Sequence, residues 1–593
     1  MASYSEKDLL FGHKKMSLWE IVKRTGRYLK GEVWVFVLAI LLLGASVAGN
    51  MLLPLVVERF TNSLDFAVSG ATAKTLIGLG VGYFAIVAVN QCFLYAQSML
   101  LQKVGQKIVY NMRVDVFNHV EEMSISQLNM MPVGSLVTRV AFYTANMSDL
   151  FTNTLISILR NIMTIVGVAI VMFIESVPLA GIMMGFLVVV FAISFFFSRY
   201  VKRTFRLERE GHSDFNTFLN ESLSGMKIIQ MFRQEKRKKD EFDVKNQYLR
   251  TMRMKVVRAF AIFRPTVNFL YYLAIAVTFF SAYRFNLAAG SVVAFYLLLN
   301  NFFSPIQNLA DSLNNLQRAH AAGEKLYSLL DVAPDVVDGP DAIDIEEFKG
   351  KIEFRNVWFA YEKEEWILKD VSFVVEPKQT CAFVGATGAG KTTILSLIVR
   401  NFEPQKGEIL IDDIPIKNIR IKSLRRAIGQ MLQDVFLFSG TIRSNITLYD
   451  DDSYTDEEIK DVCKYVNADQ FIDQLTDGLD SKVIEKGENF SSGQRQLLSF
   501  ARTVLSRPQV LILDEATSNI DTETEVLIQD SLHKMRNIGT MLVVAHRLST
   551  IQHADKIVVL QQGKVMESGN HQELLKQKGL YYKLYELQFE QAS

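Results

Sequence analysis

A glycine-rich loop followed by a lysine and threonines has the residue types and spacing for phosphate chemistry. Residues 385–392 read Gly-Ala-Thr-Gly-Ala-Gly-Lys-Thr and match the pattern G-x-x-x-x-G-K-[ST]. Glycines let backbone N–H groups close around phosphate oxygens at a helix N-terminus. Lys391 would supply a positive charge for the β and γ phosphates, and Thr392 a hydroxyl for Mg²⁺. The residues predicted to contact the nucleotide here are Gly385, Ala386, Thr387, Gly388, Ala389, Gly390, Lys391, Thr392 and Thr393.

Two acids and a histidine follow apolar runs further along the chain. Asp514 and Glu515 end a run that begins at residue 510, which is typical of a buried parallel strand whose carboxyl end points at a ligand. Asp514 is then placed to hold the Mg²⁺ shell, and Glu515 to orient or deprotonate the attacking water. The apolar run 540–545 delivers His546 to another strand end, where its imidazole could hydrogen-bond a γ-phosphate.

Strands and helices in a defined order must position these residues. Residues 381–384 form a β-like run before the glycine loop, and residues 393–399 form a helix-like run after it. A phosphate-binding loop requires this order of strand, loop and helix. The pattern therefore predicts an α/β nucleotide-binding domain.

Composition divides the chain into two parts. The 593 residues are 49% hydrophobic with only 3 Cys, which excludes a disordered chain and a disulfide scaffold, and the scattered cysteines support no metal site. The net charge of +1 is the sum of a balance of +13 over residues 1–320 and −12 over residues 321–593. We therefore expect a basic part that meets a membrane and an acidic, soluble part.

The basic part contains five uncharged stretches that are long enough to cross a bilayer as helices. They are residues 33–57, 75–102, 176–198, 265–283 and 285–310. A sixth, weaker span covers residues 152–174 and contains Arg160, for which we favour snorkelling to the interface over an intramembrane function.

Basic residues also predict the orientation of this part. Lys and Arg gather before the first span and in the second and fourth loops, so the positive-inside rule places these segments and everything after the sixth span in the cytoplasm. Residues 1–32 are polar and basic, and no cleavable signal peptide is expected. Leu18, Trp19, Val22 and Leu29 recur at near-helical spacing, which predicts a short helix in the inner interface.

Two long loops continue the helical pattern of the preceding spans. They cover residues 102–149 and 199–264, with Gly134 and Gly225 as the expected breaks. Their tips, near residues 121–128 and 220–232, either dock on the soluble part or are solvated charged helices.

An acidic segment with two prolines separates the two parts. The sequence thus predicts an α-helical six-span membrane domain at residues 1–331, a linker at 332–350 and an α/β P-loop nucleotide-binding domain at 351–593.

A further motif lies between the two phosphate elements. Residues 490–494 read Phe-Ser-Ser-Gly-Gln and precede a helix-like run. Together with residues 385–392, Gln433, the pair at 514–515 and His546, this motif makes the chain similar to ATP-binding-cassette (ABC) exporter half-transporters of the type IV fold. In that family six spans precede one nucleotide-binding domain, and the resemblance covers nearly the whole chain.

The resemblance implies an ATP hydrolase coupled to transport, with ATP and Mg²⁺ as cofactors. Tyr361 would stack on adenine, and Gln433 would touch Mg²⁺ or the water and report the nucleotide state to the spans. The implied metal ligands are Thr392, Gln433 and Asp514, and the implied catalytic residues are Glu515, His546 and Gln433.

The resemblance also implies that one chain is not a working unit. In the family, the signature motif of one cassette closes on the nucleotide bound to the P-loop of a second cassette. Here the signature residues are Ser491, Ser492, Gly493 and Gln494. A second half-transporter is therefore an expected partner, and the resemblance implies that the loop tips couple the cassette to the spans.

The signature departs from the common Leu-Ser-Gly-Gly-Gln. Phe490 replaces Leu, and Ser492 places a side chain where Gly lets the backbone approach a γ-phosphate. The chain thus combines intact hydrolytic residues with an altered signature. In this combination it resembles one subunit of the heterodimeric bacterial multidrug exporters, whose two ATP sites are unequal. A homodimer that tolerates Ser492 is the alternative.

The substrate is the least defined feature. The spans are rich in Phe, Tyr and Met, which suits varied amphiphiles, although packing against lipid explains these residues equally well. We predict ATP-driven efflux of small amphiphilic drugs across a bacterial cell membrane. The alternatives are an exporter of lipid or peptide and an ATP-gated channel or regulator. Membrane lipids and the substrate are expected partners, and no nucleic acid is.

Overall fold

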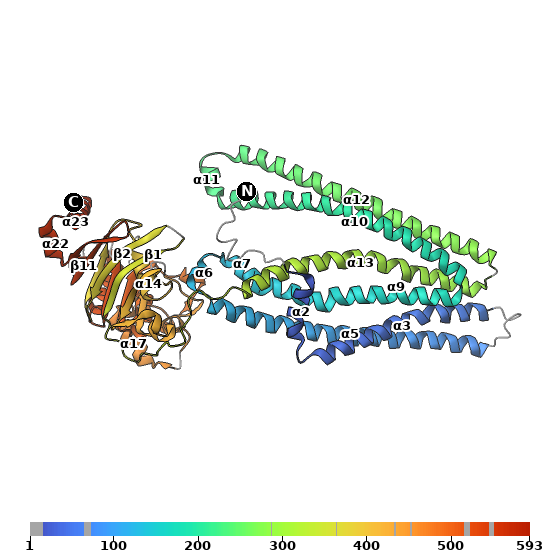
Figure 1. Cartoon of the computed structure of the whole chain (residues 1–593), viewed down its shortest axis with the longest axis horizontal. Helices are drawn as coiled ribbons and strands as arrows, with labels where there is room; N and C mark the ends of the chain where they lie inside the picture. The colour runs from blue at the N-terminus through green and yellow to red at the C-terminus, as the bar shows by residue number, and fades with distance from the viewer. Residues whose placement is uncertain are drawn as a thin grey trace. The chain divides into compact units, whose positions relative to one another are not determined.

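The computed structural model describes residues 16–64, 73–285, 287–362, 365–431, 435–450, 453–514, 522–544 and 551–592. Its contacts divide the chain into two compact units (Figure 1). The helical unit comprises Met1–Glu121 and Pro132–Val332. The α/β unit comprises Glu122–Met131 and Ala333–Ser593.

Six long helices in the described residues are apolar enough to cross a membrane, which confirms the six predicted spans. They are α3 (Val33–Ser63), α5 (Ala73–Glu122), the continuous helix Val133–Glu175, α10 (Val177–Ser224), α12 (Glu235–Arg284) and α13 (Ala289–Leu330). The third helix consists of α7 (Val133–Thr138), α8 (Thr144–Asp149) and α9 (Leu155–Glu175), joined by the π-helical turns η2 (Arg139–Tyr143) and η3 (Leu150–Thr154). The shorter elements are α2 (Leu18–Gly26), η1 (Arg27–Leu29) and α11 (Met226–Met231).

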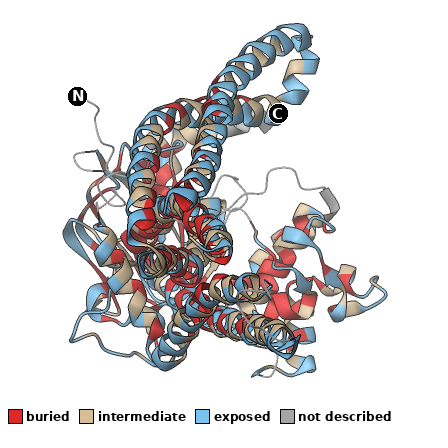
Figure 2. Ribbon diagram, turned by 90° about the vertical axis from the view of Figure 1, so that its right-hand side faces the viewer, coloured by how far each residue is buried: buried red, intermediate tan, exposed pale blue. Residues whose placement is uncertain are grey.

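Apolar side chains form the core of the helical unit where the long helices meet. Phe295, Leu298 and Phe302 of α13 are fully buried, and they belong to one cluster with Val168 and Met172 of α9. Figure 2 shows the buried residues along the contacts between helices and exposed residues on their outer faces. An exposed apolar outer face is what a helix bundle in lipid requires.

Helices α10 and α12 lie side by side as an antiparallel pair (Figure 1). The rings of Phe197 and Phe263 stack across this pair with centroids 3.8 Å apart. Gly225 ends α10 and Met226 begins α11, so the chain breaks at the predicted glycine.

The other predicted break, at Gly134, is wrong. Gly134 lies inside α7, and the chain instead turns before Pro132, which precedes the first residue of that helix. Proline lacks an N–H group and restricts the residue before it, so it stops helical hydrogen bonding more strongly than glycine does. A second break falls at Ser124, whose side chain caps α6 (Ile125–Asn129).

Arg160 lies on an exposed part of α9. Its Nη2 donates to Oε1 of Gln97 on α5, at 3.5 Å. Nearby polar contacts also join the helices: Asn90 donates to Asn50 at 2.8 Å, and the hydroxyls of Ser157 and Ser312 lie 3.0 Å apart.

The α/β unit contains a central sheet of six strands in the order β12-β11-β3-β10-β9-β6, of which β12 alone is antiparallel to its neighbour. A second, antiparallel sheet has the order β2-β1-β4-β5, and β7 pairs with β8. The strands are β1 (Ile352–Ala360), β2 (Trp366–Val375), β3 (Thr380–Val384), β4 (Lys406–Ile411), β5 (Ile414–Pro415), β6 (Ile428–Met431), β7 (Gly440–Thr441), β8 (Lys482–Val483), β9 (Val510–Asp514), β10 (Thr540–Val544), β11 (Lys556–Gln561) and β12 (Lys564–Gly569).

Helices pack on both sheets through two apolar clusters. The helices of this unit are α6, α14 (Lys391–Ile398), α15 (Ile421–Ala427), α16 (Ile442–Thr447), α17 (Asp456–Tyr465), α18 (Asp469–Ile472), α19 (Ser492–Leu505), α20 (Thr522–Met535), α22 (His571–Gln577) and α23 (Leu580–Ala592), with 3₁₀ turns η4 (Ile416–Asn418), η6 (Gly478–Asp480) and η7 (Glu485–Gly487). Strands β3 and β10 are buried along their whole length, which explains their continuous apolar runs.

Helix α6 lies in the chain between the long helix α5 and the helix that begins with α7, yet it belongs to the α/β unit. The Gln127 side chain donates to the carbonyl of Ala333 at 2.8 Å, and the Ser126 hydroxyl donates to Asp335 at 3.4 Å. This loop tip therefore docks on the first residues of the acidic segment.

Candidate ATP-binding site

The glycine loop connects β3 to α14, as the sequence predicts. Gly390 caps α14 with a φ of +102°, a left-handed conformation that favours glycine. A Cβ atom at this position would lie 2.6 Å from Cδ2 of Leu368. The loop thus brings backbone N–H groups to the N-terminus of α14, where anions bind.

The first glycine of the loop is needed for close approach to a neighbouring strand. A Cβ atom on Gly385 would lie 2.3 Å from the carbonyl oxygen of Leu560, the penultimate residue of strand β11. No side chain fits between these backbones, so the loop lies directly against β11.

Lys391 crosses the base of this loop. Its side chain is 7% exposed, and Nζ donates to the carbonyl oxygens of Gly385 at 2.7 Å and Ala386 at 3.2 Å. Burial lowers the pKa of Lys391, and the Asp514 carboxylate opposes that shift. The ammonium group is therefore held by neutral carbonyls beside the loop that would receive phosphate.

Strand register brings Asp514 to the same edge of the central sheet. Asp514 is the last residue of β9 and pairs with Val544 of β10, which in turn pairs with Phe383 of β3. The carboxyl ends of the three strands therefore meet beside the glycine loop, which is where ligands bind in open α/β sheets. Thr392 is exposed at the start of α14 and lies in the adjoining turn.

Tyr361 is placed against the same helix start. Its hydroxyl lies 3.1 Å from the hydroxyl of Thr393, which is buried in the first turn of α14. The ring is held edge-on by Phe359 at 4.9 Å and Phe402 at 5.1 Å, and 47% of the residue is exposed. A rigid aromatic surface is thus available next to the loop.

The signature residues form the N-terminus of α19. Ser491 and Gln494 make a reciprocal capping box: the Gln494 N–H donates to Ser491 Oγ at 3.2 Å, and the Ser491 N–H donates to Gln494 Oε1 at 3.0 Å. Ser492 is the first helical residue and partly exposed, whereas Gly493 is buried. The helix N-terminus is therefore preorganised for an anion.

Phe490 has a structural reason for replacing leucine. It is 6% exposed and lies in the apolar core with Phe471, their ring centroids 6.1 Å apart. Its carbonyl oxygen accepts from Arg495 Nη1 at 2.7 Å. The aromatic ring points into the unit, and the signature backbone is fixed behind it.

Three predicted site residues, Gln433, Glu515 and His546, lie outside the described residues. The structure thus brings the glycine loop, Tyr361 and Asp514 together and places the signature at a separate helix terminus. No motif in the sequence marks the residues that hold the Tyr361 ring, Phe359 and Phe402. Their signal is weak, because an aromatic residue within a strand or after a helix is typical of any core.

Family models match both parts of the chain. The "ABC transporter transmembrane region" covers residues 36–306, and "ABC transporter" covers residues 368–518. The chain belongs to the ABC transporter family. It is an exporter half-transporter of the type IV fold, with one membrane domain and one cassette that binds ATP.

Curated relatives match most of the length of the half-transporter. This chain is 36% identical to the putative ABC transporter ATP-binding protein exp8 of Streptococcus pneumoniae, over 97% of this chain and 98% of that protein. It is 36% identical to the probable multidrug resistance ABC transporter ATP-binding/permease protein YheH of Bacillus subtilis, over 90% and 80%. It is 32% identical to the ATP-dependent lipid A-core flippase of Syntrophus aciditrophicus, over 91% and 92%.

The similar structure is that of a bacterial Atm1-family ABC exporter with ATP bound. It superposes with a TM-score of 0.77 at 25% identity, over 94% of this chain and 98% of that one. The half-transporter is therefore a multi-pass membrane protein with an ATPase coupled to export, and half-transporters of this kind dimerise.

Proposed function

We propose that this half-transporter exports small amphiphilic drugs as one subunit of a heterodimeric bacterial multidrug exporter, in the position that EfrD occupies in EfrCD. The observation that carries the proposal is the contrast within the cassette. The P-loop, Lys391 and Asp514 lie together at one edge of the central sheet, where phosphate would bind, whereas the signature has a side chain at Ser492. The name of the relative YheH, a probable multidrug resistance transporter, supports the substrate class.

ATP fits the loop by the chemistry of its lining. Backbone N–H groups at the start of α14 and the Lys391 ammonium group would bind the phosphates, and Tyr361 would stack on adenine. Mg²⁺ would be held by Thr392, Asp514 and Gln433, where it would neutralise charge on the β and γ phosphates.

Hydrolysis then requires a residue that activates water. Glu515 follows directly after Asp514 at the strand end, so its carboxylate would orient or deprotonate the attacking water, and His546 would hydrogen-bond the γ-phosphate. In the dimer, the partner's signature would close this site. The residues Ser491, Ser492, Gly493 and Gln494 would close the partner's site in turn.

The proposed orientation follows from charge. Basic residues before α3 and in the long loops support an N-terminus and a nucleotide-binding domain, proposed at residues 351–593, that would both lie in the cytoplasm. ATP that draws two cassettes together would move the docked loop tip, α6, and open the membrane domain outward.

Dye transport in inverted membrane vesicles tests the function. Vesicles that contain the half-transporter and its partner should accumulate a fluorescent cationic dye against a gradient when ATP is added. Glu515→Gln should keep ATP binding and stop accumulation. Dye that only equilibrates across the membrane would identify a channel and contradict a pump.

Copurification tests the heterodimer. A tagged neighbouring half-transporter should capture this chain untagged, and the captured complex should hydrolyse ATP faster than this chain alone. A stable homodimer with full ATPase activity would contradict the heterodimer and support tolerance of Ser492.

Export of lipid is the second candidate, because several similar proteins are named ATP-dependent lipid A-core flippases. The vesicle assay separates the two. ATP-dependent movement of a fluorescent phospholipid between leaflets, without dye accumulation, would favour lipid export.

A further inference from the structure

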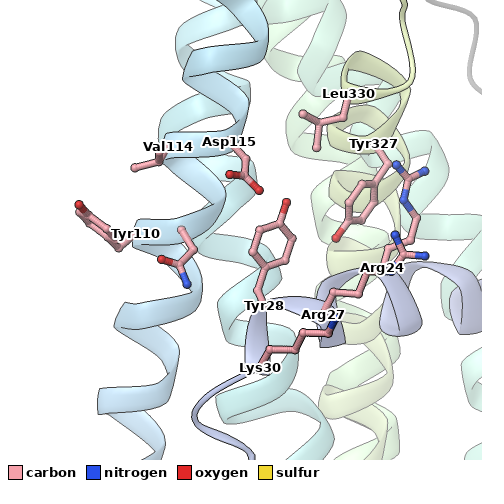
Figure 3. Close-up of a pocket in the computed structure, with 10 residues that line it drawn as sticks. Arg24, Arg27, Tyr28, Lys30, Tyr110, Val114, Asp115, Tyr327 and Leu330 are labelled. Atoms are coloured by element: carbon pink, nitrogen blue, oxygen red, sulfur yellow. The ribbon is translucent and has the colours of Figure 1, made fainter.

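A pocket at the start of the helical unit has the shape of a ligand site outside the cassette. It has a volume of about 560 Å³ and is lined by η1, the C-terminal part of α5 and the end of α13, with Arg27, Tyr28, Lys30, Asn111, Asp115 and Tyr327 in its walls (Figure 3). Small-molecule pockets commonly have volumes of about 300–1,000 Å³. The cavity is therefore large enough for a lipid headgroup.

The wall formed by α2 and α13 is rigid. Arg24 makes a two-pronged ion pair with Asp331, at 2.9 and 2.6 Å, and its guanidinium carbon lies 4.3 Å above the ring of Tyr327. The Tyr327 hydroxyl lies 2.7 Å from the buried Thr25 hydroxyl. The charge of Arg24 is thus neutralised within the protein, and its role here is to fix the wall.

Arg27 and Lys30 are different, because no carboxylate pairs with either in the described part of the chain. Both side chains belong to exposed residues on the η1 turn. The one carboxylate in the pocket, Asp115, lies beside the phenol of Tyr28 (Figure 3). Burial first, and this carboxylate second, raise the pKa of Tyr28, so the phenol stays protonated and occupies Asp115. The phenol is neutral and leaves the charge of Asp115 in place, so the two cations exceed the carboxylate by one positive charge.

Two exposed tryptophans flank the cations of this pocket in the chain. Trp19 on α2 is 75% exposed and Trp34 on α3 is 85% exposed, and the apolar span begins at Val33. Tryptophan side chains at the end of a span lie in the membrane interface. The cations at positions 27 and 30 lie between these two residues in the chain.

We propose that this pocket binds the phosphate group of an anionic phospholipid. Arg27 and Lys30 would contact the phosphate, and the amide of Asn111 would hydrogen-bond the glycerol region. The proposal rests on the membrane location of the six helices and is independent of the exported substrate. An occupied pocket would tie the entry helix α2 to α5 and α13.

Native mass spectrometry of the detergent-purified complex of this chain and its partner half-transporter tests the site. The probes are phosphatidylglycerol, phosphatidylcholine and, as a soluble phosphate, glycerol 3-phosphate. Phosphatidylglycerol should bind more tightly than phosphatidylcholine. The double variant Arg27→Gln/Lys30→Gln should weaken phosphatidylglycerol binding about thirtyfold, since each basic residue near anionic lipid contributes roughly fivefold.

The matched control is Lys23→Gln/Lys74→Gln, which removes the same charge from exposed positions on α2 and α5 outside the pocket. It should change phosphatidylglycerol binding less than about threefold, since only long-range attraction is lost. The conservative Arg27→Lys/Lys30→Arg should retain binding, and unchanged unfolding midpoints show that every variant is folded.

Three results would overturn the proposal. Equal affinity for the two lipids would remove the charge selectivity, and an equal loss in the control would show that the pocket is not the site. Glycerol 3-phosphate that displaces phosphatidylglycerol at comparable concentration would assign the pocket to a soluble phosphate in place of a lipid.

Discussion

The P-loop of the cassette and the entry of the membrane domain hold a buried and a partly buried cation in opposite ways. Lys391 donates to two backbone carbonyls only five and six residues before it, and its charge has no direct carboxylate partner among the ion pairs of the described residues. Arg24 is paired with Asp331, which lies 307 residues further along the chain. The first charge is open to a ligand, and the second is neutralised by the fold.

This difference separates a binding residue from a structural one. A buried ammonium group without a carboxylate costs free energy until an anion arrives, so its presence indicates that a ligand completes the site. A bidentate arginine–carboxylate pair is already complete and contributes to stability and geometry. Arg27 and Lys30 share with Lys391 the lack of a carboxylate partner among the described residues, but both are exposed, so water hydrates them until a ligand binds.

The comparison predicts the largest effect, a loss of ATP hydrolysis, for the substitution of Lys391. Lys391→Ala should lower ATP hydrolysis by a factor of roughly 100 or more, because the phosphates lose a preorganised positive charge. ATP binding measured with a fluorescent analogue should weaken as well. Lys422→Ala, the same change at an exposed site on α15, is the control and should retain activity.

Hydrolysis by Lys391→Ala at the unmutated rate would show that this cation is structural, like Arg24. A lowered unfolding midpoint with proportionate loss of ATP binding would lead to the same conclusion.

The next effect concerns the aromatic surface beside the P-loop. Tyr361→Ala should weaken ATP binding roughly tenfold, since a base stacked on an aromatic ring loses about 1–3 kcal/mol when the ring is removed. Tyr361→Phe is the matched variant, because it keeps the ring and loses only the 3.1 Å contact with Thr393. It should weaken binding no more than about fivefold. Equal losses in both variants, measured by titration, would assign the role to the hydroxyl in place of the ring.

The contrast between local and distant contacts explains what the sequence could predict. The P-loop can be predicted directly from the sequence, because residues 385–392 are contiguous and each of them acts through backbone atoms close to it in the chain. The six spans are equally local, since a run of apolar residues is sufficient to identify a membrane helix. Cap geometry at Ser491 and Gln494 likewise involves residues three apart.

The features that were not predicted depend on partners far apart in the chain. The pair Arg24–Asp331 and the contact between Arg160 and Gln97 leave no local pattern. Docking of the tip near residues 121–128 was one of two expected outcomes, but its specific contact, Gln127 with Ala333, leaves none either. The break near Gly134 was misplaced for a different reason. Pro132 and the Ser124 cap compete with glycine as helix terminators, and they determine where α6 and α7 begin.

A smaller effect is expected from breaking the neutralised pair. Arg24→Gln should destabilise the membrane domain by about 1–2 kcal/mol, because Asp331 loses a partly buried hydrogen-bonded partner and Tyr327 loses a cation above its ring. Thermal unfolding in detergent should show this loss while ATP binding stays the same. A double-mutant cycle with Asp331→Asn should give a coupling energy of about 1 kcal/mol. No coupling would mean that the pair does not act as one structural unit.

The smallest effect tests the asymmetry proposed for the two ATP sites. Ser492 is the first residue of α19, where Gly costs less than in a helix interior, so Ser492→Gly should change the unfolding free energy by less than about 1 kcal/mol. Removing the side chain should let the signature backbone come closer to the partner's γ-phosphate and raise nucleotide affinity at that site by up to about fivefold. Phe490→Leu is the comparison, since its ring is buried and should affect stability more than nucleotide binding. If Ser492→Gly leaves both affinity and turnover unchanged in the assembled complex, then Ser492 does not weaken the site, and the altered signature no longer distinguishes a heterodimer from a homodimer.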